Sequence, residues 1–74
     1  MNESQDTLLR LGQRIAAVRR EKGLSLRDLA RTAEISKGNL SDIERGKRDP
    51  RYSTLAAISL GLGITLIELL TIVA

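Results

Sequence analysis

Apolar residues recur along the chain at intervals of three or four positions, the spacing that places them on one face of an α-helix. The first such stripe consists of Leu8, Leu11, Ile15 and Val18. Read in this way, the pattern predicts five helices, over about residues 7–22, 26–33, 37–45, 52–62 and 66–73. No stretch has the convincing alternation of a β-strand, so we expect an all-α fold.

The segments between these helices carry the signals of helix ends. Ser25 followed three residues later by Asp28, and Thr65 followed by Glu68, each have the spacing of a capping box. The connections are short, and a chain of 74 residues is long enough for one domain but not for two. Residues 1–74 are therefore predicted to form a single five-helix domain.

The second and third predicted helices are joined by an unusually short link, which consists of Glu34, Ile35 and the cap Ser36. So short a link sets two helices at a steep angle. At 100° per residue, the third helix buries Leu40 and Ile43. Its opposite face consists of Lys37, Gly38, Ser41, Asp42 and Arg45. Short and polar side chains suit a helix that lies in a DNA major groove.

Composition excludes several classes of function. The chain has no cysteine and no histidine, which rules out disulfides and thiolate metal sites and removes the commonest general base and metal ligand. We therefore do not expect an enzyme, nor a metal or other cofactor. The absence of cysteine also fits a protein of a reducing compartment, and we expect it in the cytoplasm. Tyr52 is the only aromatic residue, which disfavours a single-strand binder that stacks bases on aromatic side chains.

Charge is distributed unevenly along the sequence. All twelve Lys and Arg, with eight of the nine Asp and Glu, lie at or before Arg51, and this part carries a charge of +4. A polyanionic partner fits this pattern, and so does a solvated surface with a buried C-terminal part. Residues 55–74 have the length of a membrane span, but Gly61 and Gly63 interrupt them and Glu68 is costly in a bilayer. No membrane partner is expected.

Two runs of sequence point to a known family. They are LSLRDLA at residues 24–30 and ISKGNLSDIERG at residues 35–46, followed by Pro50 and Leu55. Over about residues 8–70 the chain resembles the Cro/Xre (lambda-repressor-like) helix–turn–helix family. The resemblance implies a five-helix fold with the helix–turn–helix in its second and third helices. It also implies transcriptional regulation through double-stranded DNA, as a homodimer on a near-palindromic operator.

The resemblance assigns roles to individual residues. The positions from which the family reads base edges are occupied by Lys37, Gly38, Ser41 and Asp42. The family's phosphate-binding positions correspond to Arg45, Lys47 and Arg48. Ser36 and Asn39, at the start of the third helix, are further candidates for phosphate contact, although Asn39 can instead contact its own helix. The family's structural salt bridge corresponds to Arg19 and Glu44, and Glu44 borders the buried face of its helix.

Two positions depart from the family pattern. Leu26 stands where the family commonly has a glutamine that contacts a phosphate and braces the reading helix, so that contact is lost. Glu34 stands where the turn usually has glycine. If this residue is left-handed, the glutamate costs about 1 kcal/mol.

The last predicted helix is a candidate dimer interface, because it carries more apolar surface than so small a core can absorb. The residues concerned are Leu66, Ile67, Leu70, Ile72 and Val73. They can also pack within the chain or beneath a further domain. Two other functions remain open. One is an antitoxin-like DNA-binding protein whose main partner is a toxin protein, and the other is a helical protein-interaction module.

Overall fold

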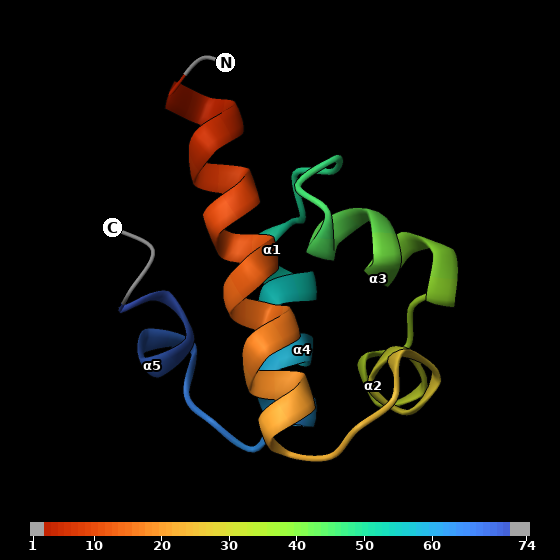
Figure 1. Ribbon diagram of the computed structural model, residues 1–74. Coiled ribbons are helices and arrows are strands. Elements are labelled where there is room, and N and C mark those ends of the chain that lie inside the picture. The colour runs from red at the N-terminus through yellow and green to blue at the C-terminus, as the bar shows by residue number, and fades with distance from the viewer. Residues whose placement is uncertain (1–2, 72–74) are drawn as a thin grey trace.

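The structure is a computed structural model that describes residues 3–71, and these residues form five helices without a strand (Figure 1). The helices are α1 (Glu3–Glu21), α2 (Leu26–Ala33), α3 (Lys37–Glu44), α4 (Tyr52–Leu62) and α5 (Leu66–Leu70). The predicted all-α, five-helix fold is therefore confirmed, with the helix–turn–helix in α2 and α3.

The helices are arranged around the longest of them, α1. In Figure 1, α2 and α3 lie on one side of α1 and α5 lies on the other, with α4 behind. Helix α2 packs on α4, and α3 packs on α1. The fully buried side chains at the centre are Ile15, Leu29, Leu40, Ile43, Ile58 and Leu69. Every helix contributes to this core, so the helix–turn–helix is held from two sides.

Helix α1 begins at Glu3, four residues before the predicted start. The added turn contains Glu3 and Asp6, whose negative charges are favourable near the positive end of the helix dipole. Asp6 also pairs with Arg10 one turn later, with 3.2 Å between Oδ2 and Nε. An apolar stripe cannot indicate this turn, because the turn contains no apolar residue.

The other helix ends lie close to the predicted ones. Helix α3 ends at Glu44 rather than at residue 45, because Arg45 leaves the helical region at φ −90° and ψ 2°. Both predicted capping boxes are present, with Ser25 and Thr65 each accepting the N–H of the residue three positions later at 3.0 Å. Helix α5 ends at Leu70 and is followed by its C-cap Thr71, so residue 71 is not part of the helix as predicted, and the predicted residues 72 and 73 lie outside the described residues.

Candidate nucleic-acid interface

Helix α3 is seated directly on the backbone of α1 at the buried residue Gly12. A side chain at this position would overlap the carbonyl oxygens of Ile43 and Glu44, so only glycine permits the approach. Leu40 and Ile43 are fully buried on the same side of α3, as the helical angles predict. One side of α3 is thereby fixed in the protein, and the opposite side is left accessible.

The end of α3 is tied to α1 by the ion pair between Arg19 and Glu44. Arg19 Nε donates to Glu44 Oε2 at 2.7 Å, and Arg19 Nη2 donates to Oε1 at 3.1 Å. The third guanidinium nitrogen, Nη1, donates to the carbonyl of Leu24 at 2.9 Å. Hydrogen bonding to Glu44 raises the pKa of Arg19, against the opposing effect of burial. The predicted pair is thus present, in bidentate form.

The turn between α2 and α3 is made by Glu34, which is left-handed at φ 58° and ψ 41°. Its N–H donates to the carbonyl of Arg31 at 3.2 Å, and the N–H of Ile35 donates to that of Ala30 at 3.0 Å. A glutamate at this backbone geometry is strained. Leu26, the second departure from the family pattern, is half-buried and packs against the core. It therefore contributes apolar packing where the family commonly has a glutamine.

The four residues expected to read base edges lie on the accessible side of α3. Lys37 and Gly38 are exposed, while Ser41 and Asp42 are half-buried. No atom lies within 4 Å of the place where a Cβ of residue 38 would stand, apart from local backbone. The backbone at Gly38 can therefore approach a flat surface closely.

Asp42 holds two of the candidate phosphate-binding arginines. Its Oδ1 lies 2.8 Å from Nη2 of Arg45, and its Oδ2 lies 3.5 Å from Nη2 of Arg48. Hydrogen bonding to Arg45, reinforced by Arg48, lowers the pKa of Asp42 below its ordinary value. The carboxylate is therefore charged at neutral pH and has a cation on each oxygen.

The remaining candidates for phosphate contact lie at the two ends of α3. Ser36 is exposed, and its Oγ accepts the backbone N–H of Asn39 at 3.0 Å, so its side chain serves as the helix cap. Arg45, Lys47 and Arg48 are exposed in the loop that follows the helix. Cations therefore gather beyond the C-terminal end of α3, while backbone N–H groups are presented at its start.

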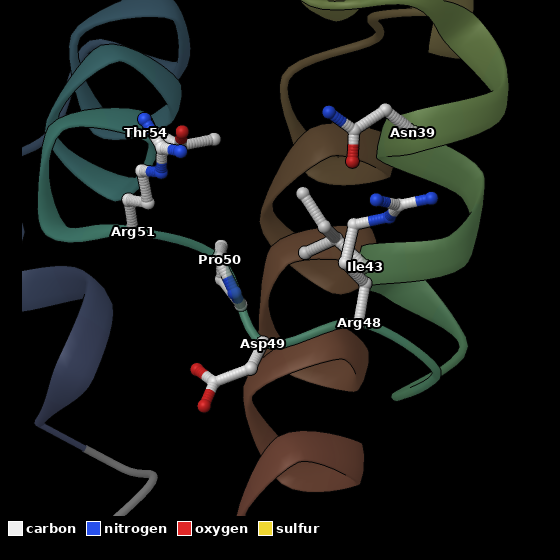
Figure 2. A pocket seen from close by; sticks show the side chains of 7 residues that line it. All are labelled: Asn39, Ile43, Arg48, Asp49, Pro50, Arg51 and Thr54. Carbon is white, nitrogen blue, oxygen red and sulfur yellow. The ribbon is translucent and has the colours of Figure 1, made fainter.

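A groove of about 350 Å³ lies between α3 and the start of α4 (Figure 2). Its walls are formed by Asn39, Ile43, Arg48, Asp49, Pro50, Arg51 and Thr54. Asn39 is half-buried, and its Oδ1 has no hydrogen-bond partner among the described residues. The sequence placed Asn39 beside the reading face, but no pattern marked Thr54, because the groove brings together residues from two helices and a loop.

The candidate dimer residues of α5 differ in accessibility. Ile67 is 80% exposed, whereas Leu66 and Leu70 are half-buried and pack against the core. Ile72 and Val73 lie outside the described residues. Leu60 of α4 is also 79% exposed. Because Leu60 lies within an apolar run, the sequence did not indicate this exposure. Leu66 and Leu70 therefore use part of their apolar surface in their own core, as the alternative of packing within the chain allowed, and the assignment of α5 as a dimer interface stays a prediction.

A membrane crossing needs a long, apolar helix, and none of the helices formed by residues 3–71 meets both conditions. The same residues contain no group of three or more side chains that could hold a metal ion.

Comparison with known proteins places the chain in a family. A family model described as "Helix-turn-helix domain" matches residues 12–74. The HTH-type transcriptional regulator DdrOP3 of Deinococcus deserti is 42% identical over 62 residues, which span 84% of this chain and 48% of that protein. The immunity repressor protein of Bacillus phage phi105 is 46% identical over 54 residues, which span 73% of this chain and 38% of that protein. The chain thus spans about half or less of these two relatives.

A solved structure is similar as well. The crystal structure of the restriction-modification controller protein C.AhdI from Aeromonas hydrophila superimposes with a TM-score of 0.82 and 31% identity. The match covers 84% of this chain and 94% of that one. With the short turn at Glu34, the seating of α3 on Gly12 and the family match over most of its length, the chain belongs to the Cro/Xre helix–turn–helix family of DNA-binding transcriptional regulators.

Proposed function

We propose that the chain is a sequence-specific transcriptional regulator that binds double-stranded DNA as a homodimer, with α3 in the major groove. The observation that carries the proposal is the placement of α3. One side of the helix is fixed by Gly12 and by the ion pair of Arg19 with Glu44, while the opposite side presents short and polar side chains. A binding site needs such a fixed backbone, because base contacts are lost when they are misplaced by about 1 Å.

Each residue of this face then has a role. Lys37 donates to the acceptors O6 and N7 of guanine, the hydroxyl of Ser41 contacts a base edge, and Gly38 permits close approach of the helix. Phosphates are bound by the cations Arg45, Lys47 and Arg48 and by the N–H groups and side chains at Ser36 and Asn39. These contacts fix the position of α3 and supply most of the salt-dependent affinity.

The geometry of DNA supports the homodimer in this proposal. Two copies related by two-fold symmetry place their reading helices about 34 Å apart on a near-palindromic site. Ile67 supports α5 as the seam, because it is 80% exposed and adjoins the exposed parts of Leu66 and Leu70 on the same helix, and contiguous apolar surface of this kind is typical of an interface. In this proposal the exposed parts of Leu66 and Leu70, together with Ile72 and Val73, complete the seam.

The experiment is sedimentation of the protein with duplexes selected from a random pool, at two salt concentrations. We expect a dimer on a near-palindromic site, with binding that weakens steeply as salt rises. Two variants separate the two kinds of contact. Lys37→Ala should lose discrimination among sites and keep non-specific binding, whereas Lys47→Ala should weaken binding to all sequences and lower the salt slope by about one.

Two results would contradict the proposal. A monomer that enriches no sequence and binds DNA at neither salt concentration would leave the reading face unused and favour a protein-interaction module. Recovery of a second protein as the main partner, with DNA binding in the background, would favour the antitoxin-like alternative.

A further inference from the structure

Asp42 stands at the centre of the charges on the accessible side of α3. It is the only acidic side chain of the described residues that is paired with two cations, and each of its oxygens faces a different arginine. Arg45 reaches it from the position directly after the end of α3, and Arg48 reaches it from further along the loop. Both arginines belong to the set to which we assign phosphate contacts.

These pairs lie at the surface, where they can exchange partners. The side chains of Arg45 and Arg48 are 57% and 54% exposed, and that of Asp42 is 33% exposed. An exposed ion pair contributes only about 0–1 kcal/mol, so a DNA phosphate can compete for either guanidinium. When Arg45 and Arg48 bind phosphates instead, however, the charged carboxylate of Asp42 needs another hydrogen-bond donor.

Whether a base edge in the major groove supplies that hydrogen-bond donor depends on the base. The amino groups N4 of cytosine and N6 of adenine donate there, but adenine also presents the acceptor N7 beside its amino group, and guanine O6 and N7 and thymine O4 only accept. Cytosine is therefore the most favourable base for a carboxylate. Acceptors repel a carboxylate that has lost its cations, and so do the phosphates.

We infer that Asp42 is a specificity-determining residue that couples base readout to phosphate binding through its two arginines. On most sequences the carboxylate retains Arg45 and Arg48, and the protein makes fewer phosphate contacts. Where a base-edge amino group such as cytosine N4 donates to Asp42, the arginines pass to phosphates. This inference rests on the proposed DNA-binding function. It identifies Asp42 as the residue that makes the affinity depend on the DNA sequence.

The chain offers a matched control in Asp49. This carboxylate lies in the same basic loop and is exposed, but it forms no ion pair with any described residue. Asp49→Asn therefore raises the net charge by the same amount as Asp42→Asn without releasing an arginine. The comparison separates the release of two particular cations from a general gain of positive charge.

The experiment measures binding of the full chain, of Asp42→Asn and of Asp49→Asn to a pool of random duplex DNA across a series of salt concentrations. We expect Asp42→Asn to bind the pool several-fold more tightly than the wild type, with a salt slope steeper by up to about two. Asp49→Asn should bind only slightly more tightly, with an unchanged slope. In rounds of selection from the pool, we expect the wild type to enrich cytosine at the position that Asp42 contacts and Asp42→Asn to lose this preference.

Each contrary result has a distinct meaning. Equal changes in the two variants, or a wild-type base preference retained by Asp42→Asn, would overturn the coupling while leaving the DNA-binding function intact. Absence of salt-dependent binding in all three proteins would overturn the proposed function and this inference with it. Thermal unfolding of each variant verifies the fold, and Asp42→Ser provides the same readings if asparagine unfolds the helix.

Discussion

Arg19 and Glu44 join the end of α1 to the end of α3 through two hydrogen bonds, of 2.7 and 3.1 Å, between nearly buried side chains. Their side chains are only 11% and 8% exposed, so the loss of one partner leaves the other charge without compensation. The pair therefore acts on the fold and, through the position of α3, on the candidate interface.

Glu44→Ala should destabilise the domain by about 3 kcal/mol, because it leaves the guanidinium of Arg19 buried and unpaired. For a domain of this size, such a loss lowers Tm by more than about 10 °C. Thermal unfolding followed by circular dichroism measures the effect. The control is Asp6→Ala, which removes the exposed pair with Arg10 and should cost less than about 1 kcal/mol. An unchanged Tm in Glu44→Ala would show that the pair does not hold α3.

Gly12→Ala should destabilise the domain by about 2–3 kcal/mol, since the added methyl group overlaps two carbonyl oxygens of α3. Backbone on both sides leaves no flexible side chain to give way. Denaturant unfolding gives the free energy of unfolding of the variant and of the wild type. If the variant proved as stable as the wild type, α1 and α3 would have to be further apart than the structure places them.

Gly38→Ala should have the opposite effect on stability, because alanine favours a helix by up to about 1 kcal/mol over glycine and has open space here. The same methyl group should weaken binding to the selected DNA site by preventing close approach of α3. The two quantities are measured on one preparation, by thermal unfolding and by titration with duplex. A variant that gains stability and keeps full affinity would remove Gly38 from the interface.

Glu34→Gly should stabilise the domain by about 1 kcal/mol, because glycine adopts the left-handed geometry of this turn without strain. Glu34→Gln keeps the strain and removes the charge, so it serves as the control and should leave stability nearly unchanged. The free energies of unfolding of the three proteins decide between strain and charge. Equal stabilisation by both substitutions would assign the effect to charge.

Stability should fall in acid because of the capping carboxylates. Backbone hydrogen bonds from Ser25 and Thr65 lower the pKa of Asp28 and Glu68 below their ordinary values. A carboxyl group whose pKa is lower in the folded state contributes its full stabilisation above the unfolded pKa of about 4 and loses it as the pH falls through the folded pKa. We therefore expect Tm to be constant from neutral pH to about pH 5 and to decline below it.

The variant Asp28→Asn/Glu68→Gln tests the origin of this decline. Its Tm should be lower than that of the wild type at neutral pH, and the difference should shrink in acid as the wild-type carboxylates become protonated. A constant difference at every pH would show that the two carboxylates do not carry the dependence.

Local signals in the sequence indicated most of the fold, because each helix of this small domain has its own apolar stripe or cap. Ser25 with Asp28 and Thr65 with Glu68 form their capping boxes as predicted. The early start of α1 escaped prediction by apolar spacing, although the pair of Asp6 with Arg10 was a visible signal for it. Charge spacing would have extended that helix correctly.

The site was less predictable, since its key contacts join residues distant in the sequence. Nothing local distinguishes Gly12, whose importance arises from the carbonyl groups of residues 43 and 44. The pairing of Asp42 with Arg45 follows from helical spacing, but its pairing with Arg48 depends on the path of the loop. The half-burial of Leu66 and Leu70 likewise depends on how α5 docks on the core.

The contact of α3 with α1 separates two roles of one short helix, which are packing on the core and presenting side chains to a partner. Gly12 meets carbonyl groups of the α3 backbone, and those groups are the same whatever side chains the exposed side carries. Residues 37, 38, 41 and 42 can therefore be exchanged without a compensating change in the core. In the proposed function, a few substitutions at these positions would change the DNA sequence that is recognised, while the contacts that hold α3 on α1 stay the same.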